Sequence, residues 1–389
     1  MSQSIKQLNW AIVIPTYQRQ AVLLRCLRFV ALQTLPPKEI IVVDASHDWE
    51  STREKIQHEL AMHYPTIVWH FVQAKRLSSA AQRNQGIALA TAEIVFLIDD
   101  DSFMYPDCAQ EVMRIYAQDT AHQVAGIMPK LEALPPPTPN LQGLANLEGF
   151  TTPNPTPNLQ GLANLEGFKP VAPNLQGLAN LEGFKHKLRA FAKLLIKDDD
   201  IFIPYDFTFP KYRLPETLKG IATHPVPMIH GARMSYRCEI LAQVHFEETL
   251  ERYAVNEDND VCYRASRIGM LLHALNARIC HAQVSEGRLT RLTTTALWGL
   301  NQAVLHRIHS PDLARFKKRF RKLLWQRLFT QTLKDILDRR WTLPSARGVW
   351  FALRHWSTIL SKTPAELRLW YPQFQKALIS QDKMERGNG

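Results

Sequence analysis

Residues 93–102 read EIVFLIDDDS, in which an apolar run, 94–98, is followed at once by Asp99, Asp100 and Asp101. A short apolar run rich in β-branched residues is typical of a buried strand in a parallel sheet. Adjacent carboxylates at a partly buried strand end repel one another, so one must keep its proton unless a cation lies between them. The stretch therefore predicts a strand that ends in a cation-binding cluster.

Two further segments have the same character, AIVIPTY from Ala11 and EIIVVDAS from Glu39. Helical patterns separate the three predicted strands. Apolar residues within 22–32 trace one helix face, and the serines that open SSAAQRNQGIALA, residues 78–90, are able to cap a helix. Strands that alternate with helices predict an α/β fold, with a Rossmann-like, mostly parallel sheet flanked by helices.

In such sheets ligands bind outside the carboxyl ends of the strands, where Thr16, Asp44 and the three aspartates all fall. In an extended chain Asp99 and Asp101 point to one side and Asp100 to the other. Mg²⁺ and Mn²⁺ prefer oxygen ligands, and Mg²⁺ often takes one or two carboxylates while substrate phosphates and waters complete its shell. The pattern predicts a metal-diphosphate site. The alternative, an acidic trio in a solvated turn, leaves the preceding apolar strand unexplained.

A second acidic stretch, NEDND at residues 256–260, precedes VCYRASRIGMLLHAL, whose apolar spacing predicts a helix over 261–275. Acidic residues before a helix can be N-terminal caps, and this interpretation fits Asp260. It explains Glu257 and Asp258 less well, because one cap suffices. A carboxylate held near a metal-bound substrate can instead act as a general base on an incoming hydroxyl.

The composition predicts a folded, soluble protein in the cytoplasm. No stretch approaches the roughly 20 apolar residues that cross a bilayer, and the N-terminus MSQSIKQLNW lacks the apolar segment of a signal peptide. The 5 cysteines are scattered without a CxxC pair. We therefore interpret them as reduced thiols that act as small buried apolar residues.

The net charge of +11 is concentrated at the C-terminus, since residues 301–389 hold 18 Lys/Arg against 6 Asp/Glu, which is +12. A basic patch indicates an anionic partner, either a membrane face or nucleic acid, or else only a solvated helix surface. The stretch RFKKRFRKLLWQRLF, from Arg315, predicts an amphipathic helix with the cations on one side. On a helical wheel its other side is apolar and holds Phe316, Phe320, Leu323, Leu324 and Phe329. Basic amphipathic helices with aromatic residues lie at membrane interfaces or pack on their own domain.

The unit PNLQGLANLEGF occurs three times, from Pro139, Pro157 and Pro173. Each copy is too short to bury a face alone and carries helix-weakening Gly and Asn. We interpret the repeats as a duplicated surface insertion, with a leucine-lined strip for docking a protein as the alternative. The predicted organisation is an α/β domain over 1–300, interrupted by an insertion at 134–185, followed by a basic helical region over 301–389.

Taken in order, the motifs resemble family 2 glycosyltransferases of the GT-A fold. VIPTYQR from Val13 is similar to the first strand and loop of that family, and IIVVDAS to its second strand. SAAQRNQGI resembles the start of its ARN-x-G helix, and FLIDDDS its DXD metal motif. GARMSYRCEI and FEETLERYAVNEDNDVCYR resemble the acceptor half with its ED pair. The resemblance covers residues 8 to about 130 and about 226 to 288.

The resemblance implies an inverting enzyme that moves a sugar from a nucleotide-diphosphate donor to a hydroxyl of a glycan or lipid-linked acceptor, in cell-surface glycan or glycolipid synthesis. It implies Mg²⁺ or Mn²⁺ as cofactor. Because such acceptors are often lipid-linked or surface glycans, it also favours the inner face of the membrane over nucleic acid as the partner of the basic region. By position, it implies catalysis by Asp258 with Glu257 beside it, donor-nucleotide contacts from Thr16, Asp44, Arg83, Asp99 and Asp100, and metal ligands Asp101 and His281. The sequence departs from the family after Asp44, where Ala45 and Ser46 replace the usual acidic or amide residue and Gly.

Two other classes share parts of this pattern. A nucleotidyltransferase would carry a Gly/Lys-rich triphosphate loop after the first strand, and PTYQRQA, residues 15–21, offers none. A catalytically idle glycan-binding or scaffold protein would keep the fold and use the repeats and the basic region for docking. The presence of Asp99, Asp101 and Asp258 favours an enzyme over a scaffold.

Overall fold

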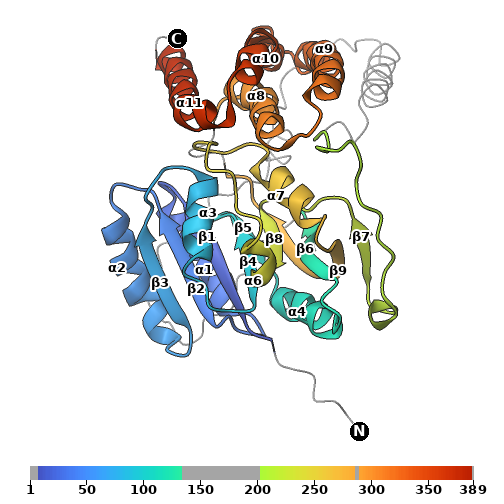
Figure 1. The fold of residues 1–389 in the computed structure, drawn as a ribbon. Helices are drawn as coiled ribbons and strands as arrows, with labels where there is room; N and C mark the ends of the chain where they lie inside the picture. The colour runs from blue at the N-terminus through green and yellow to red at the C-terminus, as the bar shows by residue number, and fades with distance from the viewer. Residues whose placement is uncertain (1–7, 134–201, 285–288, 388–389) are drawn as a thin grey trace, which may run out of the picture. The chain divides into compact units, whose positions relative to one another are not determined.

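The computed structural model describes residues 8–133, 202–284 and 289–387, which all belong to one compact unit (Figure 1). The three PNLQGLANLEGF repeats lie outside the described residues. The first half of the fold contains β1 (Trp10–Thr16), α1 (Gln20–Ala31), β2 (Glu39–Asp44), α2 (Trp49–Glu59), η1 (Ala61–His63), β3 (Val68–Gln73), α3 (Ser79–Ile87), β4 (Ile94–Ile98), β5 (Ser102–Met104), α4 (Cys108–Gln118) and β6 (Val124–Glu132). The three predicted strands are therefore confirmed as β1, β2 and β4.

The second half contains η4 (Glu216–Leu218), β7 (Thr223–Val226), β8 (Arg233–Arg237), α6 (Cys238–Leu241), α7 (Glu257–Ala265), β9 (Met270–His281), α8 (Arg291–His309), α9 (Leu313–Leu337), α10 (Pro344–Ser361) and α11 (Pro364–Gly387). In Figure 1 the helices α8 to α11 form the orange-to-red end of the chain. The boundary predicted at residue 300 falls inside α8. In the described part of the chain, no helix combines the length and apolarity needed to cross a bilayer.

The strands form one mixed sheet in the order β3-β2-β1-β4-β8-β6-β9-β5, with β7 paired to β9. The first four strands are mutually parallel, and β8 pairs antiparallel with β4. The α/β fold class with a mostly parallel sheet at its centre is confirmed. Because β1 pairs with β2 on one side and β4 on the other, the chain reverses its direction of winding there, which is where open α/β sheets bind ligands.

Alternate residues of the strands face two separate hydrophobic clusters. In β1, Ala11 and Val13 belong to one cluster, and Trp10, Ile12 and Ile14 to the other. The Val13 cluster contains side chains of α3, α7 and α8, whereas the Ile12 cluster contains those of α1 and α4. This period of two is the signature of a sheet covered on both faces.

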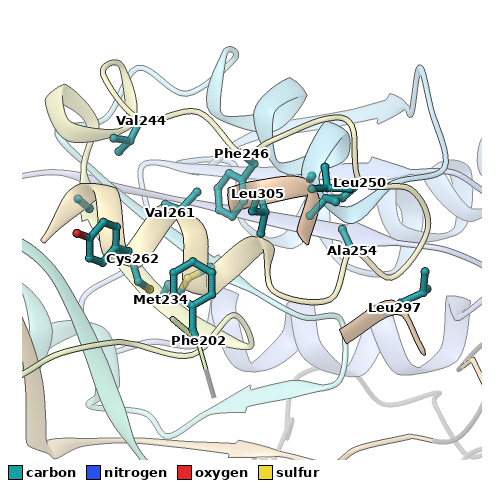
Figure 2. Close-up of a cluster of buried hydrophobic side chains, with 14 of the residues drawn as sticks. Phe202, Met234, Val244, Phe246, Leu250, Ala254, Val261, Cys262, Leu297 and Leu305 are labelled. Atoms are coloured by element: carbon teal, nitrogen blue, oxygen red, sulfur yellow. The ribbon is translucent and has the colours of Figure 1, made fainter. Parts of the chain in front are cut away.

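Part of the Val13 cluster is drawn in Figure 2. Phe246 and Leu250 come from the segment before α7, Val261 and Cys262 from α7, and Leu297 and Leu305 from α8. The packing ties α7 to the sheet through Met234 of β8. The buried thiols agree with the prediction for Cys26, Cys108, Cys262 and Cys280, but Cys238 is partly exposed.

The helix predicted over 261–275 is wrong in its second half. Helix α7 ends at Ala265, and Met270 opens the long strand β9, which pairs in parallel with β6. At the junction, a Cβ added to Gly269 would lie 2.8 Å from the carbonyl oxygen of Gln123, so the two backbones approach closely. A run of apolar residues fits either a helix or a buried strand. Here the residues from Met270 onward form a strand, because they pair with β6.

Helix α9 confirms the predicted helix over RFKKRFRKLLWQRLF. Phe316, Phe320, Leu323 and Leu324 are buried on one face, as predicted. Phe329 is not part of that face, because 56% of it is exposed. Its position nine residues after Phe320 places it half a turn away, on the opposite side of the helix.

Candidate functional site

A cavity of about 710 Å³ opens at the carboxyl ends of β1 and β4. Thr16 ends β1, the aspartates 99–101 follow β4, and His281 ends β9. The segment 230–232 also reaches this edge, because β8 runs antiparallel to β4 and therefore starts where β4 stops. The first turn of α7 completes the wall with Glu257 and Asp258. The cavity thus brings together eight of the nine predicted site residues, with Asp44 as the exception.

The candidate ligands of a cation lie in one group on this wall: Asp99, Asp101 and His281 each offer an atom within 4.8 Å of the others. His281 Nε2 lies 3.0 Å from Asp101 Oδ1 and 3.8 Å from Asp99 Oδ2. The register of β5 with β9, which sets Ser102 opposite His281, fixes this approach. Two carboxylates and an imidazole are a donor set that divalent ions accept, so the residues fit the predicted metal.

Asp101 is held as an anion. Burial alone would raise its pKa, but the hydrogen bond and charge of His281, the charge of Arg19 and the amide of Val284 together lower it below the ordinary value. The Val284 amide donates to Asp101 Oδ2 at 2.9 Å. A carboxylate that stays ionised without a bound cation is prepared to receive one.

Asp100 lines the same cavity, but it is not one of the three candidate cation ligands. It accepts hydrogen bonds from Thr16 Oγ1 at 2.8 Å and from Arg19 Nη1 at 2.9 Å. Burial raises its pKa to about 6 despite the neighbouring guanidinium. Arg19 was not singled out from the sequence, although it closes the VIPTYQR motif. Thr16 and Asp100 therefore brace the loop after β1, and their contact with a nucleotide stays a prediction.

Arg83 connects the two acidic groups of the cavity. Its Nη2 donates to Asp99 Oδ1 at 2.7 Å and to the Gly231 carbonyl at 3.3 Å, and its Nη1 contacts Glu257 Oε1. Only 3% of Arg83 is exposed. The adjacent negative charges raise its pKa although burial opposes this. The guanidinium thus links Asp99, after β4, to Glu257 of α7. Arg83 and Glu257 are 174 residues apart, so the sequence did not reveal this pair.

The acidic pair on α7 lies inside the helix and not before it. The helix begins after Asn256, whose φ of 76° places it in the left-handed region. Glu257 is buried, and its pKa rises to about 7 because burial and the charges of Asp258 and Asp99 outweigh Arg83 and the Ser79 hydroxyl. Asp258 is only partly buried, and its Oδ2 accepts the Gly231 amide at 3.0 Å.

The interpretation of Asp260 as an N-cap is wrong. Asp260 lies in the first turn of α7 and is fully buried. It accepts the Tyr205 hydroxyl at 2.6 Å and pairs with Arg264 one turn later at 2.5 Å. Its role is to hold the helix against the 202–206 segment, because a buried carboxylate needs both partners.

Asp44 does not line the cavity, although it ends β2 beside Thr16. Its Oδ1 accepts a hydrogen bond from the Ser46 amide at 2.7 Å. Ser46 is one of the two residues, with Ala45, at which the sequence departs from the family pattern. The Ser46 hydroxyl in turn accepts the Gln18 amide at 2.7 Å. Burial raises the pKa of Asp44. Its contact with a nucleotide base stays a prediction.

Comparison with known proteins agrees with these motifs. Residues 11–152 match Glycosyl transferase family 2. An uncharacterized glycosyltransferase, YwdF of Bacillus subtilis, is 31% identical over 120 residues, which is 30% of this chain and 42% of that protein. The chain thus matches less than half the length of this relative.

Among solved structures, the mannosyltransferase PcManGT from Pyrobaculum calidifontis in complex with GDP-Man and Mn²⁺ is 14% identical, with a TM-score of 0.44 over 97% of this chain and 84% of that chain. TarS 1-349 of S. aureus is also 14% identical, with a TM-score of 0.42 over 91% of this chain and 90% of that chain. By the sequence match and the motifs it contains, residues 11–152 are similar to glycosyl transferase family 2.

Proposed function

We propose that the protein transfers a sugar from a nucleotide-diphosphate donor to a hydroxyl acceptor, with inversion at the anomeric carbon. One observation carries the proposal: a single cavity is lined by the Asp99, Asp101 and His281 group on β4 and β9 and by Asp258 on α7. The match of residues 11–152 to glycosyl transferase family 2 and the name of the Bacillus subtilis relative support the same class of reaction.

Asp258 is the better candidate for the general base. Glu257 Oε1 is already engaged by Arg83 and by the Ser79 hydroxyl at 2.8 Å, and the buried acid is partly protonated near neutral pH, since its pKa is about 7. Asp258 lines the cavity, is partly exposed, and is oriented by the Gly231 amide. A carboxylate so placed can accept a proton from a bound hydroxyl.

The reaction is a single displacement. The acceptor oxygen forms its bond to the anomeric carbon as the bond from that carbon to the donor diphosphate breaks, and the acceptor proton passes to Asp258. Asp99, Asp101 and His281 would hold a divalent cation, Mg²⁺ or Mn²⁺, which when bound supplies charge neutralisation for the leaving diphosphate. The acceptor is a glycan or lipid-linked saccharide in this proposal, as the family resemblance implies.

The first experiment tests donor binding and chemistry separately. Thermal stabilisation by a panel of UDP- and GDP-sugars, with and without Mn²⁺, identifies the donor, and calorimetry then measures its affinity. Asp101→Ala should weaken the metal-dependent affinity, whereas Asp258→Asn should keep it and lose about 100- to 10,000-fold in transfer rate. Asp48→Asn, an exposed aspartate outside the cavity lining, is the matched control.

The outcomes separate the alternatives. An Asp258→Asn enzyme as active as wild type would exclude Asp258 as the base. Absence of stabilisation by every nucleotide sugar, together with binding of a free glycan, would favour the idle glycan-binding protein. Nuclear magnetic resonance of the first-formed product decides whether the anomeric configuration is inverted.

A further inference from the structure

Helix α9 carries a second apolar side in addition to its buried face. Trp325 is 53% exposed, Phe329 56% and Ile336 43%. Residues four and eleven positions apart fall on the same side of a helix with 3.6 residues per turn. These three side chains therefore form one exposed stripe along α9, separate from the face that packs in the core through Phe316 and Phe320.

Helix α10 extends the stripe. Its Trp350 is 49% exposed, and its ring centroid lies 6.3 Å from that of Trp325. We call Trp325, Phe329, Ile336 and Trp350 the aromatic surface. Exposed large apolar residues occur singly on most proteins, but a contiguous set on two adjoining helices marks a surface that binds something.

Cations flank the aromatic surface. Lys318, Arg321 and Lys322 are all exposed on α9, and Lys318 lies seven residues, two helical turns, before Trp325 on the same side. The acidic residues near the other end of the helix do not balance them, because Asp335 is buried and Asp338 pairs with Arg340 at 2.8 Å. The surface thus combines aromatic rings, an aliphatic side chain and positive charge.

We propose that the aromatic surface and its three cations dock the protein on an anionic lipid bilayer. Tryptophan and phenylalanine side chains settle at the level of the lipid headgroups, and lysine and arginine reach the phosphates while their stems lie along apolar surface. Anionic lipids attract such basic segments within a Debye length. The charge of +12 over residues 301–389 complements that partner.

The same charge disfavours a second copy of the chain as the occupant. A twofold dimer would place this surface against itself and bring Lys318, Arg321 and Lys322 against their own copies. None of the four aromatic-surface residues lines the cavity, so docking and catalysis can be measured independently.

The test is flotation of the full-length protein with vesicles of equal parts phosphatidylglycerol and phosphatidylcholine, against vesicles of phosphatidylcholine alone. Wild type should float with the anionic vesicles at low salt and be released at high salt. Trp325→Ala/Phe329→Ala should reduce the bound fraction at least about tenfold while keeping the thermal midpoint, because both side chains are more than half exposed. Lys318→Gln/Arg321→Gln/Lys322→Gln should reduce anionic binding and its salt dependence. Met62→Ala, on an exposed apolar residue of η1, is the matched control.

Wild type that stays unbound with anionic vesicles at low salt would overturn the proposal. So would an aromatic double variant that floats like wild type. If that variant instead turns a dimer into a monomer in sedimentation while vesicle binding is unchanged, a second copy covers the surface. If single-stranded DNA competes and vesicles do not bind, the surface takes nucleic acid. Donor hydrolysis in solution should be equal in every variant, which separates this result from failure of the proposed transferase activity.

Discussion

Removing the Arg83 guanidinium tests the central cross-link of the site. Arg83→Met keeps the buried stem and deletes the charge that contacts Glu257 and Asp99. The Glu257 side chain is 7% exposed and that of Asp99 23%. The larger loss of stability should therefore come from the contact with Glu257, where water cannot replace the guanidinium. Breaking a buried ion pair on one side costs about 3–5 kcal/mol. We expect a loss of that size in the free energy of unfolding.

A double-mutant cycle isolates the interaction. Glu257→Gln removes the partner charge, and Arg83→Met/Glu257→Gln leaves neither charge stranded. The double variant should be more stable than the sum of the two single losses by about 1–3 kcal/mol, measured by urea unfolding followed by circular dichroism. Arg237→Met, which strands Asp119 in a comparable buried pair far from the cavity, controls for the general cost of an orphaned carboxylate. Additive losses, or a single Arg83→Met loss below about 1 kcal/mol, would refute the cross-link.

Three further perturbations test other contacts. A Cβ at Gly231 would lie 3.2 Å from Asp258 Oδ2, so Gly231→Ala should displace the base and lower kcat by up to about 100-fold with donor affinity retained. Burial lowers the pKa of His306 to about 3 from 6.5, so the unfolded chain binds the proton first and stability falls as pH drops below 6.5. At pH 5 the free energy of unfolding should be about 2 kcal/mol lower than at pH 8 because of this group. His306→Gln should remove that difference, as measured by unfolding curves at pH 5 and pH 8. Asn301 Nδ2 donates to the Val255 carbonyl at 2.7 Å, so Asn301→Ala should cost about 1–3 kcal/mol and lower kcat, with the unfolding midpoint and initial rates as readouts.

Local pattern predicted three strands of the sheet and one wall of the site, because these depend on short stretches. The run before Asp99 became β4, and Ser78 accepts the Ala81 amide as the cap of α3. The extended chain predicted for Asp99 to Asp101 is wrong, because residues 100 and 101 form a turn and all three aspartates line one cavity. The family resemblance implied that Asp101 and His281 lie together, and the pairing of β5 with β9 is what brings them there.

The parts that sequence reasoning missed depend on long-range contacts. The apolar spacing of residues 261–275 predicts a helix where β9 begins, because spacing alone does not distinguish a helix from a strand when the partner strand β6 is unknown. The local sequence predicts a cap at Asp260, since nothing in it shows that the Tyr205 hydroxyl donates to this carboxylate. Arg83 was expected at the nucleotide, and only the assembled fold shows it bound to Glu257.

The start of α7 depends on helices that follow it in the chain. Asn256 occupies the left-handed region, which disfavours a residue with a Cβ and persists only where its surroundings fix it. Its Nδ2 donates to the Trp298 carbonyl of α8 at 2.8 Å, and the Glu251 amide donates to Gln375 of α11 at 3.0 Å. Helices α8 and α11 therefore hold both ends of the segment that leads into α7. Since Asp258 is two residues beyond Asn256, these C-terminal helices help to set the position of the proposed base. The C-terminal region that carries the proposed membrane-binding surface therefore also supports the wall of the proposed active-site cavity.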